Sequence, residues 1–212
     1  MKPGTQNPER PEDVLAYESR FWSTGRSVAG VDEAGRGPLA GPVIAAAVVL
    51  AEGVHVEGAG DSKKLSFTVR EELYAEILAE ASSVGIGVGS VQEIDRYNIL
   101  NATTLAMNRA VTQLSEHPGH IVVDGLPVKK LKWEHDAVVG GDGLVHSIAC
   151  ASIVAKVTRD RLMRRLALRY PGYSWEKNVG YGTVAHRAAI KKLGLTSHHR
   201  VTFGGLQYEL DV

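Results

Sequence analysis

Two adjacent carboxylates, Asp32 and Glu33, stand at the end of a short apolar run and lead into a turn rich in glycine and proline. The turn, residues 35–42, contains three glycines, two prolines and one arginine. Paired acids supply oxygen ligands for hard cations, and a glycine-rich turn exposes backbone N–H groups to an anion. This combination suits chemistry on a phosphate, although such pairs and turns taken alone are more often ordinary surface features.

The glycine spacing does not fit a dinucleotide-binding fingerprint. Gly35, Gly37 and Gly41 follow the pattern G-x-G-x-x-x-G, which is one residue longer than G-x-G-x-x-G. The apolar residues 43–50 that come next are typical of a buried strand rather than of a phosphate-binding helix. The acidic pair therefore needs chemical partners elsewhere in the chain.

Two further strand-like runs end on an acid beside a glycine, and these acids are Asp124 and Asp142. Functional groups collect at strand ends in open α/β sheets, so all four acids could converge. Neighbouring side chains of a regular strand face opposite sides of the sheet. Asp32 and Glu33 can therefore share a site only if their strand twists or ends there.

Four converged carboxylates would repel one another in a partly desolvated cleft, and divalent cations relieve that repulsion. A set of ligands made only of oxygen favours Mg²⁺ or Mn²⁺ over zinc. The chain has neither a cysteine pair nor an H-E-x-x-H segment to bind zinc. Two hard cations held by carboxylates are the arrangement for phosphodiester hydrolysis.

The elements that must position these acids alternate between strands and helices, which indicates an α/β domain. Expected strands are one that reaches Asp32 and others over about 43–50, 84–88 and 120–124. Expected helices are about 13–24, one capped by Ser66, 98–115, 145–169, and one capped by Thr183 and ended at Gly194. Residues 1–12 are predicted to be a disordered tail. Residues 13–212 are predicted to form one catalytic domain, with a helical subregion from about 170 to 212.

Composition narrows the class of protein. The chain of 212 residues is long enough for a sizeable core, and 24 basic residues balance 24 acidic ones, so any contact with nucleic acid must use local patches. The single cysteine, Cys150, lies in an apolar run and is predicted to be buried. The polar start is not a signal peptide, and no apolar stretch reaches membrane-spanning length. We therefore expect a cytoplasmic protein with no membrane contact.

Six segments carry a specific resemblance when taken together and in order. They are VDEAGRGP at 31–38, DSKKL at 61–65, VDG at 123–125, ASIVAKVTRD at 151–160, GYGT at 180–183 and SHHR at 197–200. The chain resembles the ribonuclease HII family, the type 2 ribonucleases H, from about Tyr17 to Phe203. The resemblance implies a ribonuclease H-like fold, with a central mixed sheet flanked by helices and a small helical C-terminal region.

The resemblance also implies an activity. Family members hydrolyse RNA within RNA–DNA hybrids and cut 5′ of ribonucleotides embedded in duplex DNA, leaving 3′-hydroxyl and 5′-phosphate ends. The implied mechanism uses two cations, Mg²⁺ or Mn²⁺, in an enzyme expected to be a monomer. Metal ligation and catalysis would fall to Asp32, Glu33, Asp124 and Asp142.

The substrate contacts follow from the same resemblance. Gly35, Arg36 and Gly37 would read the ribose 2′-hydroxyl, largely through backbone groups, and glycine permits that close approach. Tyr181 would pack against the deoxyribose just 3′ of the ribonucleotide. The paired lysines before the second expected helix, Lys63 and Lys64, would contact phosphates.

Other charged residues have weaker predicted roles. Five arginines on the 145–169 helix favour contact with a duplex backbone; they are Arg159, Arg161, Arg164, Arg165 and Arg169. Asp160 is predicted to pair with a helix arginine such as Arg164. His198 and His199 are predicted to lie at the surface or on phosphate rather than to bind metal.

Two other functional classes stay open. A phosphatase or nucleotidyl transferase for small nucleotides would share the carboxylates, but a small substrate needs no extended basic track. A non-catalytic hybrid-binding module is disfavoured by the four acids, because carboxylates weaken binding to a polyanion unless metals use them.

Overall fold

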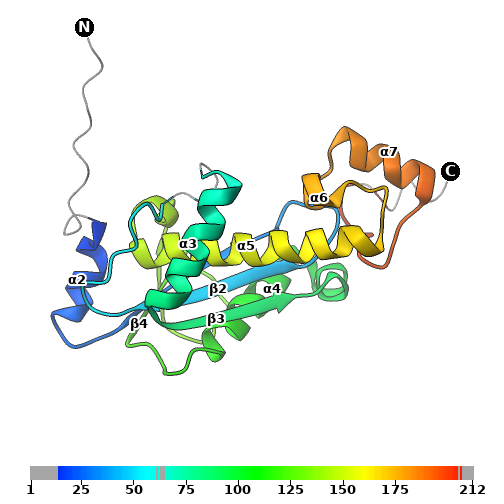
Figure 1. The fold of residues 1–212 in the computed structure, drawn as a ribbon. Helices are drawn as coiled ribbons and strands as arrows, with labels where there is room; N and C mark the ends of the chain where they lie inside the picture. The colour runs from blue at the N-terminus through cyan, green and yellow to red at the C-terminus, as the bar shows by residue number, and fades with distance from the viewer. Residues whose placement is uncertain (1–13, 61, 63–64, 205, 207–212) are drawn as a thin grey trace, which may run out of the picture.

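A five-stranded mixed sheet forms the centre of the computed structural model, which describes residues 14–60, 62, 65–204 and 206 (Figure 1). The strand order is β3-β2-β1-β4-β5. The central strand β1 (Val28–Ala34) runs antiparallel to β2 (Val43–Leu50) and parallel to β4 (His120–Asp124). The edge strands are β3 (Ala81–Gly89) and β5 (Asp136–Val138). The predicted mixed sheet is confirmed. The predicted tail, residues 1–12, lies outside the described residues.

Helices cover both faces of the sheet (Figure 1). On one face α3 (Phe67–Glu80) and α5 (His146–Arg169) pack on alternate residues of β2, and α4 (Val91–Thr112) packs on the others from the opposite face. All eight residues of β2 are therefore buried. This double coverage explains why the strand reads as an unbroken apolar run rather than as an alternating one.

Glycines in β3 let α4 lie unusually close to the sheet. A Cβ atom added at Gly85 would lie 2.0 Å from the carbonyl oxygen of Ala110, and one added at Gly87 would lie 1.9 Å from that of Ala106. No side chain fits at those distances. The strand expected over about 84–88 is confirmed.

One expected boundary was wrong and one strand is longer than expected. Strand β1 reaches Asp32 as expected and continues through Ala34. Helix α4 begins at Val91 rather than near residue 98, because Ser90 and Glu93 form a reciprocal capping box there. Asn98 has a left-handed backbone, with φ of 69°, and interrupts the helical spacing that would have revealed the first turns.

The C-terminal region has a core of its own at the far end of α5 (Figure 1). Two short helices, α6 (Trp175–Asn178) and α7 (Val184–Leu193), pack there around the buried Trp175 indole. The Thr183 side chain caps α7 as predicted, accepting from the His186 N–H at 3.2 Å. The small helical C-terminal region is confirmed.

A buried histidine pair ties this core together. The His186 ring lies 2.9 Å from the Tyr181 carbonyl oxygen through Nδ1, and its Nε2 accepts from the Trp175 indole N–H at 2.9 Å. His199 Nε2 lies 3.1 Å from His186 Nε2, and His199 Nδ1 accepts from the Thr196 N–H at 2.9 Å. His199 is only 2% exposed, so its predicted surface position was wrong. These contacts leave each ring neutral.

Acid should therefore destabilise the C-terminal region. Burial, followed by the neighbouring His186, lowers the pKa of His199 from 6.5 to about 4. The unfolded chain then binds a proton that the folded chain excludes. The free energy of unfolding should fall as pH drops from 6.5 towards 4, and this loss can be measured by urea unfolding across that range.

Two variants separate this histidine from other acid-sensitive groups. His199→Gln should reduce the acid-induced loss, whereas His117→Gln, at an exposed histidine, should retain it. Part of the loss should remain in both, because burial also lowers the pKa of His146 to about 4. Identical pH dependence in the parent and His199→Gln would contradict the prediction.

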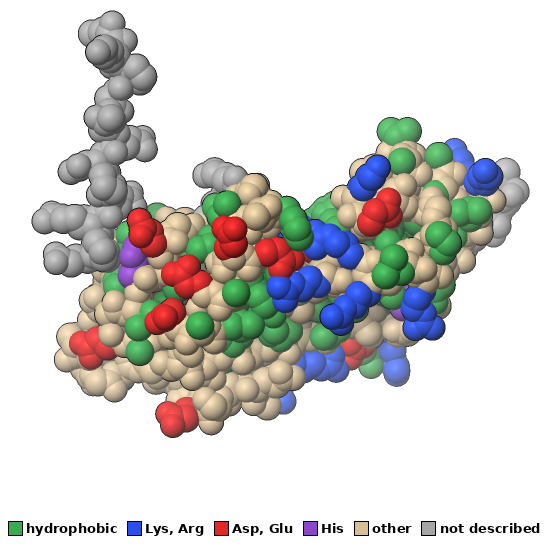
Figure 2. Space-filling view, in the orientation of Figure 1, with side chains coloured by type: hydrophobic (Ala, Val, Ile, Leu, Met, Phe, Trp, Pro, Cys, Tyr) green, Lys and Arg blue, Asp and Glu red, His purple; other side chains and the backbone are tan. Residues whose placement is uncertain are grey.

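Charges are segregated on the surface shown in Figure 2. Asp and Glu side chains prevail on the half that contains α2 (Ala16–Trp22), and Lys and Arg side chains prevail towards the end of α5 and the α6–α7 region. A chain with zero net charge thus presents a local basic area, as expected. Among the helices in the described part of the chain, none has the length and apolarity to cross a bilayer.

Candidate active site

Asp32 is a buried carboxylate near the end of β1. It is 5% exposed and accepts from the Glu33 N–H at 2.6 Å, and the Ser152 side chain on α5 also donates to it. Burial, then the charge of Glu33, raises the pKa of Asp32 to about 8, and the charge of Asp124 adds to the rise. Asp32 is thus an acid whose negative charge its surroundings disfavour.

Asp124 and Asp142 come to the same edge of the sheet through strand register. The parallel pairing of Val31 with Val123 makes Asp32 and Asp124 neighbours at the carboxyl ends of β1 and β4. Asp124 Oδ1 accepts from the Gly141 N–H at 2.7 Å. Asp142 is the next residue, on the short 3₁₀ turn η1 (Gly141–Gly143), and is 8% exposed. Three predicted acids are therefore gathered by backbone geometry.

Glu33 occupies a different position from Asp32. Because β1 continues to Ala34, the two side chains alternate along extended backbone, and Glu33 Oε1 pairs with Arg36 Nη1 at 3.1 Å. Within the described residues, no three His, Cys, Asp or Glu side chains have the arrangement of a metal site. The acids are brought to one edge without forming a finished coordination shell.

The glycine-rich turn and Tyr181 also come together. A Cβ atom added at Gly37 would meet the Tyr181 ring at 3.7 Å, and Tyr181 is 44% exposed. Gly35 is buried with φ of 96°, and a Cβ atom there would lie 2.0 Å from Arg159 Nε. Glycine is thus required at position 35 by the protein beneath it, whereas position 37 is open.

The paired lysines, Lys63 and Lys64, lie outside the described residues. Their neighbour Ser62 is buried, and its Oγ lies 2.9 Å from Ser152 Oγ. Ser152 in turn contacts Asp32. Ser62 itself is therefore anchored beside the acidic edge.

The predicted arginine track on α5 is wrong in part. Arg159 is 1% exposed and donates to backbone carbonyl oxygens inside the protein, so it cannot meet a duplex. Arg161 and Arg164 both pair with Glu71 on α3, Arg164 at 3.7 Å. Arg165 and Arg169 are exposed. The sequence prediction treated all five as one charged track along the helix, but the turn packed against α5 buries the first of them.

Asp160 also has a different partner from the predicted one. Its carboxylate pairs with Lys156, one turn earlier, at 2.7 Å, rather than with Arg164, one turn later. Asp160 is 4% exposed, and the flexible lysine stem reaches it from the half-buried side of α5. The predicted pairing with a helix arginine such as Arg164 was therefore wrong.

Sequence reasoning missed the two guanidiniums that hold the glycine-rich turn. Arg200 donates to the carbonyl oxygens of Gly35, Arg36 and Gly41, at 2.6, 3.0 and 2.8 Å. Arg159 holds the second half of the turn. The available signals were their location inside two of the family-like segments and, for Arg159, the helix face that it shares with Ser152 seven residues earlier.

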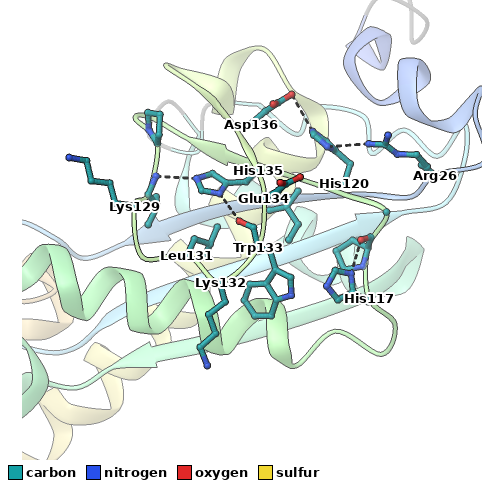
Figure 3. A pocket seen from close by; sticks show the side chains of 15 residues that line it. Arg26, His117, His120, Lys129, Leu131, Lys132, Trp133, Glu134, His135 and Asp136 are labelled. Carbon is teal, nitrogen blue, oxygen red and sulfur yellow. Dashed lines mark hydrogen bonds and ion pairs between the residues drawn. The ribbon is translucent and has the colours of Figure 1, made fainter.

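A large depression lies at the other end of the same strands (Figure 3). It has a volume of about 1090 Å³ and is lined by His120, Trp133, His135 and Asp136, among others. His135 Nε2 accepts from the Val128 N–H at 3.1 Å, so this histidine shapes its own loop. His120 opens β4 and Asp124 closes it, which separates the depression from the acidic edge by about 13 Å.

Most of the chain is similar to proteins of known family. The ribonuclease HII family model matches residues 29–205. A ribonuclease HII from Granulibacter bethesdensis is 52% identical over 201 residues, covering 92% of this chain and 90% of the relative.

Solved structures share the fold. The ribonuclease H2 of Pyrococcus horikoshii OT3 aligns with a TM-score of 0.75 at 27% identity, covering 87% of this chain and 97% of that one. Bst-RNase HIII in complex with Mn²⁺ aligns with a TM-score of 0.68 at 18% identity, covering 88% of this chain and 70% of that one. The chain therefore belongs to the ribonuclease HII family and is a metal-dependent endoribonuclease that acts on RNA–DNA hybrids.

Proposed function

We propose that this enzyme also cuts 5′ of single ribonucleotides embedded in duplex DNA, by a two-cation mechanism that leaves 3′-hydroxyl and 5′-phosphate ends. The observation that carries the proposal is the parallel register that places Asp32 beside Asp124 and, through the Gly141 N–H, brings Asp142 to the same edge. One chain supplies all four acids, so we propose that it acts as a monomer.

The residues present fit hard divalent cations. The gathered ligand atoms are carboxylate oxygens, the type that Mg²⁺ and Mn²⁺ prefer. Mutual repulsion and burial already disfavour the charge of Asp32, and a bound cation would relieve both. The Mn²⁺ in the Bst-RNase HIII structure supports the same choice. We assign Asp32, Glu33, Asp124 and Asp142 as the ligands.

Each part of the chain then has a chemical task. Bound cations would supply an activated water and stabilise the attacking and leaving oxygens. The Gly141 N–H fixes the orientation of the Asp124 carboxylate. Backbone groups of Gly35, Arg36 and Gly37 would bind the ribose 2′-hydroxyl, while Tyr181 would pack against the following deoxyribose.

The direct test uses a labelled DNA duplex that contains one ribonucleotide. With Mg²⁺ the enzyme should make a single cut 5′ of the ribonucleotide, and without a divalent cation it should make none. An all-DNA duplex is the substrate control, and free nucleotides test the rival phosphatase class. Cleavage of hybrids with no cleavage of the embedded ribonucleotide would refute the finer specificity.

Salt dependence tests the proposed phosphate contacts of Lys63 and Lys64. Each phosphate contact releases about 0.9 counterions on duplex DNA. The double variant Lys63→Ala/Lys64→Ala should therefore flatten the slope of log affinity against log salt by about 2. Affinity can be measured by fluorescence anisotropy with Ca²⁺, which leaves the substrate uncut.

The matched control removes two lysines from the other end of the sheet. Lys129 and Lys132 line the depression in Figure 3, away from the acidic edge. The variant Lys129→Ala/Lys132→Ala should keep the parent slope. If the two double variants changed the slope equally, the phosphate track would not run past residues 63 and 64.

A further inference from the structure

One buried guanidinium organises the glycine-rich turn, residues 35–42. Arg200 has no exposed surface, and its three hydrogen bonds go to carbonyl oxygens of the turn, at Gly35, Arg36 and Gly41. The Arg200 N–H itself donates to the Leu39 carbonyl at 2.8 Å. A single residue from the end of the chain thus holds four carbonyl groups of the turn.

These contacts determine which way the N–H groups of the turn point. In a planar trans peptide the C=O and the following N–H point in opposite directions. Because Arg200 draws the carbonyls of Gly35 and Arg36 inward, the N–H groups of Arg36 and Gly37 point outward. Arg36 and Gly37 are both exposed, and within the described residues neither of these N–H groups has a protein acceptor.

A second buried guanidinium, that of Arg159, holds the other half of the glycine-rich turn. Arg159 donates to the carbonyls of Ala40 and Pro42 and to that of Val179, at 3.0, 3.0 and 2.9 Å. It thereby joins the turn to the loop that carries Tyr181. Burying two like charges close together is unfavourable. The carbonyl oxygens they bind offset much of this cost, which indicates that turn geometry is what they provide.

We propose that Arg200 is a positioning residue for ribose recognition, because it orients the N–H groups of Arg36 and Gly37 towards the 2′-hydroxyl. The inference rests on the proposed function of the turn and deepens it. A planar fork of five donors can bind carbonyls that lie in different directions, whereas the single ammonium of lysine cannot reproduce that pattern.

The test compares two variants of the same segment. Arg200→Lys keeps the charge but loses the fork. Thr202→Val removes only the hydroxyl hydrogen bond to Asp95, at 2.7 Å, and leaves the guanidinium contacts in place. Both may be followed by thermal unfolding, so that lost stability is measured separately from lost recognition.

The experiment measures how well the protein discriminates between two duplexes, rather than activity alone. Affinities are measured with Ca²⁺ for a duplex that contains one ribonucleotide and for the all-DNA duplex of the same sequence. Arg200→Lys should reduce the ratio of the two affinities by about tenfold, roughly the value of one or two hydrogen bonds. Thr202→Val should keep the parent ratio.

The outcomes are distinguishable. A parent that discriminates, with an Arg200→Lys variant that has the same ratio, overturns the role of Arg200 and leaves the proposed function standing. This holds also when the variant binds both duplexes more weakly by the same factor, because the ratio is then unchanged. A parent that neither cuts nor discriminates overturns both proposals.

A second measurement needs no variant and so does not depend on folding of Arg200→Lys. Amide hydrogen exchange by NMR should show fast exchange at Arg36 and Gly37 in the free parent. The ribonucleotide duplex should slow this exchange more than the all-DNA duplex does. Slow exchange at both amides in the free protein would overturn the proposed orientation.

Discussion

Asp124→Asn should lower kcat/KM for hybrid cleavage by more than about 100-fold while leaving the protein folded. Loss of a group that only supports a metal ligand costs about 10–100-fold, so loss of the ligand charge itself should cost more. The amide keeps a carbonyl oxygen that can still accept from the Gly141 N–H, as Asp124 Oδ1 does at 2.7 Å. Cleavage rates at saturating Mg²⁺ measure the effect.

Asp32→Asn should behave in the same way and, without metal, should be at least as stable as the parent. Asp32 is buried beside Glu33 and Asp124, so the neutral amide removes repulsion and a desolvation cost. Urea unfolding in EDTA measures this. Asp136→Asn, at an exposed acid at the start of β5, is the matched control and should retain parent activity. Near-parent turnover by either active-site variant would show that the ligand assignment is wrong.

Tyr181→Ala should lose more activity on a single embedded ribonucleotide than on a continuous RNA strand. The Tyr181 ring lies beside Gly37 and is 44% exposed, so it can present a face to a sugar. Such packing contributes about 1–3 kcal/mol, which corresponds to roughly 5- to 150-fold. A continuous RNA strand has a 2′-hydroxyl at the position that the ring would pack against, so it gains less from the contact. The two substrates should be compared at matched salt.

Two controls identify the origin of that effect. Tyr181→Phe should keep most of the preference if the ring face acts, and lose it if the hydroxyl acts. Tyr97→Ala removes a tyrosine of similar exposure, 42%, from α4 and should leave the ratio of the two activities unchanged. An equal loss on both substrates in Tyr181→Ala would make the ring structural.

Local signals predicted most of the architecture. The unbroken apolar run of β2 and the capping residues Ser66 and Thr183 correctly marked one strand and the starts of two helices. The start of α4 was missed because Asn98 interrupts its spacing, although the capping residues at 90 and 93 were readable. Sequence patterns predict a helix or strand well where an apolar run or a capping residue is not offset by a second, conflicting local signal.

The acidic edge was predictable because Asp32 and Asp124 lie near the carboxyl ends of neighbouring strands and Asp142 lies on the turn after a third, so local position implies a shared edge. The buried roles of Arg159, Arg200 and His199 were not predictable. Each depends on which distant segment covers the side chain, as when the residues after 195 close over the turn that begins at residue 35. From sequence alone, a charged side chain is expected at the surface. Only the tertiary contacts show where such a side chain is buried instead.

Helix α5 sets the distance between the acidic edge and the glycine-rich turn. Ser152, which contacts Asp32, and Arg159, which holds the glycine-rich turn, are seven residues apart on one continuous helix. Seven residues make about two turns, so both side chains face the same way at an axial separation of about 10 Å. One inserted residue between them would rotate Arg159 by about 100° and detach the turn from the acids. Length changes should therefore be tolerated in surface loops of this enzyme but not between residues 152 and 159.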